Sequence, residues 1–564
     1  MNYRRKVIWI ALALLLGALA VRMVNCRRGI LADEITTYWV SRLPESRIVE
    51  ERLAHNHLPT YFLLMRQWLS LVGVSELTLR LPSIISGAVA VAALFLICAR
   101  RFSLSVSLLA AALFGLNATH LFVSQWARMY ALTTLLEVLL FGLLLSDLRR
   151  PSARRLLAYA AVVIAGCCLH LLFLQMAAIV CGLLLWERWL TARSRRQPIE
   201  EPSSRTATPS PAPATFTTRP DQPRSLTADL VRYLSPFALG AVLLLVWFNH
   251  AQTLNPGDAQ IDTQLPWLDV QTSPIPLHAE NLKPPRHQVA DPSRVVLRVA
   301  FGDFSYWPFL QSGWPKYLMR STLYALAALL LWAAFRAGPG MGAGVKDVGR
   351  VLADRSSSQD EGRALRFAVL WAVLPPLLMV VGAMTFAWVP APAPRWLIGT
   401  GAAWALLFAF GVSRITSGTW PRRWAAGVLL SASVFIAWGA LRNGGDGLRE
   451  AFAYWRAHAG PKEKVFLAHR GYLEQAMQFE GITLPPESLR AGTVLDYYSG
   501  PDAVNKLVAF ADGDSPIWIL HYRFPPGTVL KEAFSLMSSS WRTELAFECR
   551  ACSVYRLSRI PETR

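Results

Sequence analysis

The stretch "LPSIISGAVAVAALFLICA", residues 81–99, carries no charged side chain and is about as long as the hydrocarbon core of a bilayer requires. Arg100 and Arg101 follow it directly. An apolar run of this length that ends in basic residues is typical of a membrane-spanning helix whose basic end lies in the cytoplasm. This stretch therefore predicts a membrane protein.

Comparable apolar runs recur along the whole chain of 564 residues. Hydrophobic residues make up 53% and charged residues 17% of the chain, whereas soluble proteins carry about 25% charged residues. The sequence predicts about eleven transmembrane helices. The runs lie near residues 7–23, 81–99, 103–118, 130–146, 153–170, 171–190, 231–249, 317–335, 366–388, 395–413 and 424–441.

The net charge of +20 raises the question of a nucleic-acid partner. The arginines, however, form short clusters between apolar runs rather than one basic face, so membrane topology explains them better. With a cytoplasmic N-terminus, the short outer turns hold only Arg128 and Arg395. Residues 1–23 also have the pattern of a signal peptide, and we expect an uncleaved first helix.

This topology predicts a multispanning all-α membrane domain over residues 1–441 and a small extracytoplasmic α/β domain over residues 442–564. Two long outer loops, 24–80 and 250–316, belong to the membrane domain. The first of them has helical spacing and predicts one or two amphipathic helices. Residues 191–228 are rich in Pro, Ser, Thr and Arg and predict a disordered cytoplasmic linker.

Two adjacent carboxylates, Asp33 and Glu34, follow the first apolar run in "RRGILADEITTYWVSR", residues 27–42. A charge in hydrocarbon costs roughly 2.5 to 3.5 kcal/mol, so the pair must lie in water, in a polar cavity or beside a cation. A solvated helix end is the alternative to a functional site. Glu137 lies within a predicted span, where an ionisable residue is either functional or hydrogen-bonded to other helices.

Three further stretches extend the "ADE" at residues 32–34: "HNHLPTYFLLMRQW" (55–68), "GVSELTLRLPSIISGAVAVAALF" (73–95) and "VSQWARMYALTTLL" (123–136). In this order, the motifs resemble those of the GT-C superfamily of membrane glycosyltransferases. Within it, the sequence is similar to the branch of the protein mannosyltransferases and the aminoarabinose transferase that modifies lipid A. The resemblance covers roughly residues 1–190.

The resemblance implies transfer of a sugar from a polyprenyl-phosphate donor, with inversion and without a nucleotide sugar. The acceptor would be a lipid, a glycan or a protein at the periplasmic face of the inner membrane. In that family the Asp of the first-loop pair serves as base or orients the acceptor, a role that falls here on Asp33 with Glu34 as its neighbour. A carboxylate in this role contributes about 10²- to 10⁴-fold to the rate.

Binding of the phosphate leaving group requires cations. The topology places Arg128, His57, Arg80 and Arg395 at outer helix ends or in outer loops, where anchoring to lipid head groups is the alternative role of the arginines. Arg128 matches an Arg of the family. His57 stands where relatives often carry Lys, and Tyr130 where some carry a second Asp.

His55 and His57 form an HxH pattern that could hold a metal ion with Asp33 or Glu34, but two histidines and a carboxylate arise often by chance. We therefore expect neither a metal nor another cofactor. Cys549 and Cys552 are compatible with a local disulfide, with free thiols, or with metal or redox chemistry.

Two other functions stay open at this point. An oligosaccharide transferase or ligase would move a preassembled glycan rather than one sugar. A transporter or lipid flippase would use the membrane arginines and Glu137 as a permeation path, although no internal repeat is visible in the sequence.

Overall fold

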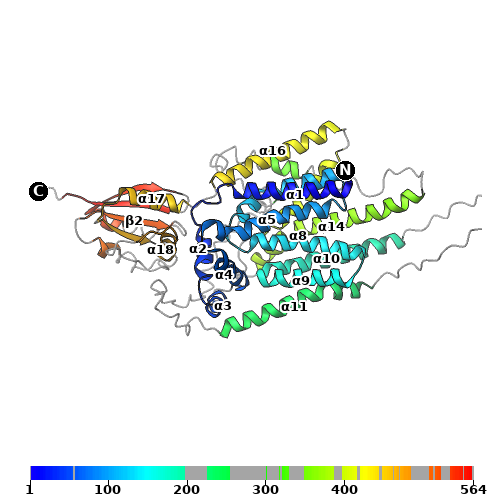
Figure 1. The fold of residues 1–564 in the computed structure, drawn as a ribbon, viewed down its shortest axis with the longest axis horizontal. Coiled ribbons are helices and arrows are strands. Elements are labelled where there is room, and N and C mark those ends of the chain that lie inside the picture. The colour runs from blue at the N-terminus through cyan, green and yellow to red at the C-terminus, as the bar shows by residue number, and fades with distance from the viewer. Residues whose placement is uncertain are drawn as a thin grey trace, which may run out of the picture.

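The computed structural model is mostly helical, with a small sheet near the C-terminus (Figure 1). It describes residues 2–196, 225–253, 348–385, 397–483 and 507–561, apart from short gaps within these ranges, and also residues 300, 317 and 321–328. The expected outer loop 250–316 and most of the expected linker 191–228 lie outside the described residues.

Seven described helices are long and apolar enough to cross a membrane, or eight if the bent pair α6 and α7 forms one span. The chain is thus a multi-pass membrane protein. The helices of the bundle are α1 (Tyr3–Met23), α5 (Glu76–Cys98), α6 (Leu104–Gly115), α7 (Ala118–Ser124), α8 (Tyr130–Arg149), α9 (Ala153–Leu169), η1 (Leu171–Leu174), α10 (Gln175–Arg196), α11 (Leu226–Thr253), α14 (Val348–Thr385), α15 (Thr400–Ser413) and α16 (Thr419–Asn443).

This number is lower than the eleven spans expected from the sequence, for identifiable reasons. Helix α9 has 17 residues and α15 has 14, whereas a span needs about 20. The predicted span 317–335 lies mostly outside the described residues. Helices α6 and α7 meet at an angle of 59°, where Asn117 caps α7 by accepting a hydrogen bond from His120 N–H.

The first outer loop contains three short helices rather than one or two: α2 (Ala32–Val40), α3 (Glu45–Ala54) and α4 (Thr60–Val72). Pro44 directly precedes α3 and Pro59 directly precedes α4. Proline is tolerated at a helix start but interrupts a helix interior, so the two prolines divide the segment.

The C-terminal part forms a four-stranded mixed sheet in the order β1-β2-β4-β3. Strand β1 (Lys464–Ala468) pairs parallel with β2 (Ile517–Tyr522), which pairs antiparallel with β4 (Cys552–Arg559). Strand β3 (Trp541–Glu548) forms an antiparallel hairpin with β4. Two helices, α17 (Leu448–His458) and α18 (Arg470–Phe479), pack against the sheet.

The sheet and α2–α4 lie at the same end of the helical bundle, which we call the sheet end (Figure 1). Helix α1 begins at the opposite, N-terminal end, where the Tyr3 hydroxyl donates to the carbonyl of Ala99 at 3.2 Å. One apolar core joins α2 to the sheet, and Tyr38 packs edge-on against Phe479 with 5.1 Å between ring centroids.

Candidate active site

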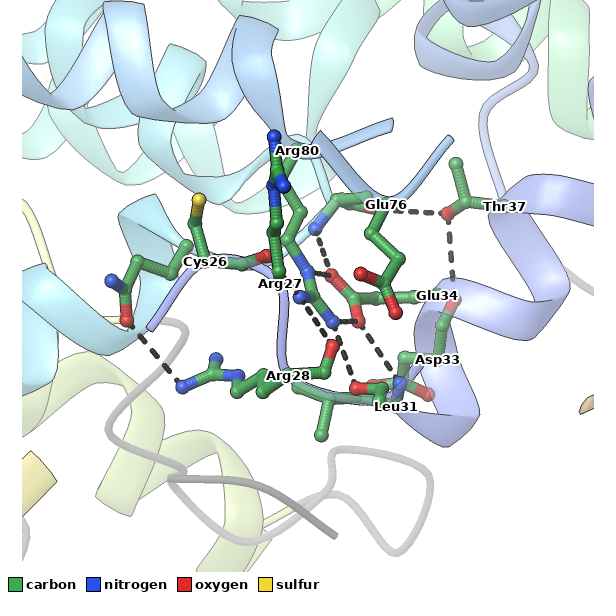
Figure 2. A network of polar contacts seen from close by, with 12 residues as sticks. Cys26, Arg27, Arg28, Leu31, Asp33, Glu34, Thr37, Glu76 and Arg80 are labelled. Carbon is green, nitrogen blue, oxygen red and sulfur yellow. Dashed lines mark hydrogen bonds and ion pairs between the residues drawn. The ribbon is translucent and has the colours of Figure 1, made fainter. Parts of the chain in front are cut away.

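Glu34, the third residue of α2, is completely buried and forms a two-pronged ion pair with Arg80 of α5 (Figure 2). Arg80 Nε donates to one carboxylate oxygen at 2.8 Å and Nη2 to the other at 2.6 Å. The backbone N–H groups of Leu31 and Ala127 donate to the same oxygens at 2.9 and 3.0 Å. Both oxygens of Glu34 are therefore occupied by protein donors.

The remaining N–H groups of Arg80 hold the loop between α1 and α2 (Figure 2). Nη1 donates to the carbonyl groups of Cys26 and Arg28, and Nη2 donates to the carbonyl of Gly29 at 3.0 Å. An Arg side chain has five N–H donors, and all five are used here. Arg80 was expected from the sequence to bind substrate, but in the structure all its donors bind protein groups and fix the loop between α1 and α2.

Glu34 stays ionised despite its burial. Burial alone would raise its pKa, but the guanidinium of Arg80, the more distant Arg28 and the N–H of Ala127 together hold the pKa of Glu34 below its ordinary value. A charged, fully hydrogen-bonded carboxylate is a poor proton acceptor. The Glu34–Arg80 pair is suited to fixing the position of α2 rather than to acid–base chemistry.

Asp33 has a different environment, because neighbouring residues of a helix point in directions about 100° apart. Its side chain is 31% exposed, and its Oδ1 atom lies 3.3 Å from Nη2 of Arg128. Asp33 is thus a carboxylate that is both paired with a cation and open to the surroundings. The two acidic residues that the sequence presents as a pair have separate roles in the structure.

Arg128 leaves much of its hydrogen-bonding capacity unused. Its side chain is only 8% exposed, and within the described part of the chain its Nε and Nη1 atoms have no hydrogen-bond partner. The guanidinium also lies over the ring of Phe62, 5.7 Å from the centroid. Buried donors without a partner are costly, so these atoms are suited to an anionic group brought by a ligand.

The segment between α7 and α8 holds Arg128 in place. Ser83 of α5 donates through its hydroxyl to the carbonyl of Arg128 at 3.1 Å, and Thr37 of α2 donates to the carbonyl of Ala127 at 2.8 Å. The side-chain amide of Gln125 donates to the carbonyls of Arg22 and Val24. Three separate parts of the chain therefore fix the backbone around Arg128.

Two further arginines near Arg128 were not among the site residues expected from the sequence. Arg52 of α3 lies over the same Phe62 ring, 4.9 Å from its centroid, so this ring lies beside two guanidinium groups. Arg28 lies over Phe122 and donates to Gln125 at 3.4 Å. The local sequence of either arginine gives no signal for these contacts, because Phe62 and Phe122 lie on other helices, α4 and α7.

Tyr130 and Glu137 lie on one face of α8 and line a narrow cleft with Thr133, Thr134, His170 and Gln175. Tyr130 packs between Trp126 and His170, at 5.6 and 5.7 Å between ring centroids. Glu137 is buried and accepts a hydrogen bond from the Trp371 indole at 3.3 Å. A side chain at Gly399 would displace the Glu137 carboxylate from this position. Glu137 is thus hydrogen-bonded to another helix, α14, which was one of the two roles that the sequence left open for it.

The C-terminal sheet contacts the loop through Arg449 of α17. Its guanidinium pairs with Glu480 through two bonds of 2.9 Å, donates to the carbonyl of Arg27 at 2.9 Å and also pairs with Glu76, at the start of α5. The loop that precedes Asp33 is therefore held from the membrane side by Arg80 and from the sheet side by Arg449.

The other expected residues are placed less centrally or not at all. His57 lies between α3 and α4 with an exposed side chain, while His55 and Arg395 lie outside the described residues. No group of three His, Cys, Asp or Glu side chains that could hold a metal ion occurs within the described ranges. The Cys549 thiol donates to the carbonyl oxygen of Cys552 at 3.1 Å, and the Cys552 N–H donates to Cys549 Sγ at 3.2 Å.

No protein-family model and no curated protein matches the chain. Among solved structures it is similar to ArnT from Cupriavidus metallidurans bound to undecaprenyl phosphate, with 11% identity over 98% of each chain and a TM-score of 0.48. It is also similar to the archaeal oligosaccharyltransferase AglB from Archaeoglobus fulgidus, in complex with an inhibitory peptide and a dolichol-phosphate. That match has 13% identity over 92% of this chain and 70% of AglB, with a TM-score of 0.46.

Both proteins are transferases of the GT-C superfamily, which the sequence motifs resemble. The assignment of a function depends on the geometry around Asp33 and Arg128.

Proposed function

We propose that this chain is a GT-C-type glycosyltransferase that moves a sugar from a polyprenyl phosphate to an acceptor hydroxyl. The observation that carries the proposal is the contact of Asp33, a partly exposed carboxylate, with Arg128, a buried guanidinium that has two N–H-bearing nitrogens without a partner in the described structure. One group can accept a proton while the other binds a phosphate, and both are needed for the reaction.

In the proposed reaction the acceptor oxygen attacks the anomeric carbon and forms the new glycosidic bond. The bond between that carbon and the phosphate oxygen breaks, and the carrier phosphate keeps the electron pair. The acceptor proton goes to Asp33, while Arg128 stabilises the negative charge that grows on the phosphate. Attack from the face opposite the leaving phosphate inverts the anomeric configuration.

Glu34 and Arg80 take a positioning role in this proposal. Their ion pair fixes the first turn of α2 on α5, and Asp33 belongs to that turn. The N-terminus of α2 also favours negative charge, because the partial positive charge of a helix N-terminus stabilises carboxylates in the first turn. Removal of Glu34 would thus displace the base without removing it.

The proposal assigns residues 1–441 to the membrane domain and residues 442–564 to an extracytoplasmic domain over the site. The site would lie at the periplasmic face of the inner membrane, and the acceptor would be a lipid, a glycan or a protein. His57, Tyr130, Arg395 and His55 stay candidates for substrate contacts. Neither a metal nor a nucleotide takes part.

The test is carrier release by the purified full chain in detergent, with a panel of polyprenyl-phosphate sugars, a membrane lipid extract and mass spectrometry of the products. We expect wild type to release polyprenyl phosphate and Asp33→Asn to be slower by about 10²- to 10⁴-fold. Asp360→Asn is the matched control, because Asp360 pairs with Arg149 at the other end of the bundle. It should keep wild-type turnover.

Equal turnover of wild type and Asp33→Asn would remove Asp33 from the reaction. Failure of folded wild type to consume any donor, with acceptor present in excess, would contradict the proposed function as a whole. The mass added to the acceptor separates transfer of one sugar from transfer of an assembled glycan.

A further inference from the structure

A second basic region lies at the N-terminal end of the bundle, away from Asp33. A cavity of about 250 Å³ opens there between the turn after α5 and the junction of α8 and α9. Five arginines and one serine line it: Arg100, Arg101, Ser146, Arg149, Arg150 and Arg155. Its volume is below the roughly 300 to 1,000 Å³ of sites for drug-sized ligands, so a compact group is the fitting occupant.

The positive charge of this cavity is poorly balanced by the protein. Arg149 pairs with Asp360 at 2.9 Å, whereas the other four arginines have no carboxylate partner among the residues that the structure describes. The nearby Asp147 is already occupied by Arg232 and Tyr233. Among the described residues, Asp360 thus offsets only part of the charge of five arginines, through its pair with Arg149 and its field at Arg101.

Two of the arginines are fixed by the backbone. Arg101 donates to the carbonyl of Ile97 at 2.9 Å and to the Ser146 hydroxyl at 3.1 Å, and Arg155 donates to the carbonyls of Ser146 and Arg150. Burial lowers the pKa of Arg101 although the carboxylate of Asp360 opposes the shift, and the nearby charges of Arg100 and Arg149 add to it. Arg100 and Arg150 are exposed, and within the described structure their side chains make no hydrogen bond, although the Arg150 backbone does. Two anchored and two uncommitted guanidinium groups therefore face one volume.

The cavity lies at the level of a membrane surface. Helix α8 begins at Tyr130, beside Arg128, and ends at Arg149 after 20 residues. A helix of this length is about 30 Å long, the thickness of the hydrocarbon core of a bilayer. The cavity and the Asp33 site therefore lie at opposite membrane surfaces, and one phosphate group cannot contact both.

We propose that this arginine-lined cavity binds a phosphate group, and that the head group of an anionic membrane lipid supplies it. Planar guanidinium groups bind phosphate oxygens in pairs, and basic pockets at the cytoplasmic ends of membrane helices are suited to anionic head groups. Basic residues that serve topology alone need not enclose a cavity. Free phosphate offers the same chemistry, so the test includes both sources.

The experiment is native mass spectrometry of the purified full chain in detergent, titrated with phosphatidylglycerol, with phosphatidylcholine or with inorganic phosphate. The main variant is R100Q/R150Q, which removes the two uncommitted arginines. R154Q is the matched control. Arg154 is exposed and lies beside Arg155 in the first turn of α9, but it does not line the cavity. R100K/R150K keeps the charge but loses the paired hydrogen bonds. Thermal unfolding verifies that each variant is folded.

We expect phosphatidylglycerol to bind in preference to phosphatidylcholine, and R100Q/R150Q to weaken its binding by about tenfold. R154Q should stay within about twofold of wild type and R100K/R150K should lie between them. If inorganic phosphate binds with the same dependence on Arg100 and Arg150 and phosphatidylglycerol does not bind, the cavity is a phosphate site with a soluble source. Binding that neither double variant changes, or that R154Q weakens equally, would overturn the proposal.

Discussion

At the sheet end of the bundle, Arg80 and Arg128 each lie against a carboxylate, whereas at the N-terminal end Arg100 and Arg150 line a cavity and contact none among the described residues. The buried Arg80 uses all five of its N–H donors in hydrogen bonds to protein groups. The guanidinium groups of Arg100 and Arg150 make no hydrogen bond within the described protein. The comparison separates arginines that hold the protein together from arginines left for a ligand.

Stability gives the largest expected difference between the two ends. Arg80→Ala leaves the Glu34 charge buried and without its partner, so we expect a loss of about 3 to 5 kcal/mol. Arg149→Ala breaks a pair whose arginine is 48% exposed, and its cost should stay below about 1 kcal/mol. Thermal unfolding in detergent measures both. Similar losses for the two variants would contradict the comparison.

Arg128 is intermediate between the two kinds of arginine, because it is buried but only partly used. Arg128→Gln should weaken donor binding by about 10- to 100-fold through the loss of charge-assisted hydrogen bonds to phosphate. Arg128→Lys should recover part of this, since it restores the charge without the planar fork. Direct titration with a polyprenyl phosphate checks the prediction, and unchanged affinity in Arg128→Gln would refute the phosphate role.

The pH dependence of stability tests whether Glu34 is ionised. Its pKa is lowered in the folded chain, so its contribution is present above the ordinary pKa, for which 4.5 is the reference value, and is lost as pH falls through the folded value. The stability gap between wild type and Glu34→Gln should therefore shrink as pH falls below about 4. A gap that is constant with pH would show that folding does not lower the pKa of Glu34.

The smallest effect is expected for the link to the C-terminal sheet. Arg449 is 40% exposed, so solvent screens its pairs with Glu76 and Glu480, and Arg449→Ala should cost less than about 1 kcal/mol. Faster proteolysis between α16 and β1, at unchanged melting temperature, would show a loosened contact. A loss of unfolding free energy as large as that of Arg80→Ala would show that Arg449 is as important for the stability of the fold as Arg80.

The sequence predicts most of the membrane spans and singles out Asp33 and Arg128, which the structure brings into contact, because each depends on local composition or on a short motif. It does not separate Asp33 from Glu34, since that separation depends on Arg80, which lies 46 positions further along. One local signal exists: Glu34 occupies the third position of α2, from which Glu often reaches back to the residue before the helix. Its bond to the Leu31 N–H is of this kind.

The arginine-lined cavity illustrates the other limit of sequence reasoning. Arg100 and Arg101 belong to one inter-helix turn, and Arg149, Arg150 and Arg155 belong to another. Each cluster by itself has the pattern of a topology signal. Only the packing of α5 beside α8 brings the two turns together around one volume, and no spacing in the chain encodes that packing.

The attachment of Arg80 to the loop before α2 has a consequence for where chemistry can occur along the membrane normal. Arg80 lies on the second turn of α5, a membrane-spanning helix whose depth the bilayer sets. Because Glu34 is bound rigidly to that turn, the height of Asp33 above the hydrocarbon follows the insertion of α5. A change in bilayer thickness would then change the height of the Asp33 carboxylate relative to the phosphate of a membrane-embedded lipid substrate.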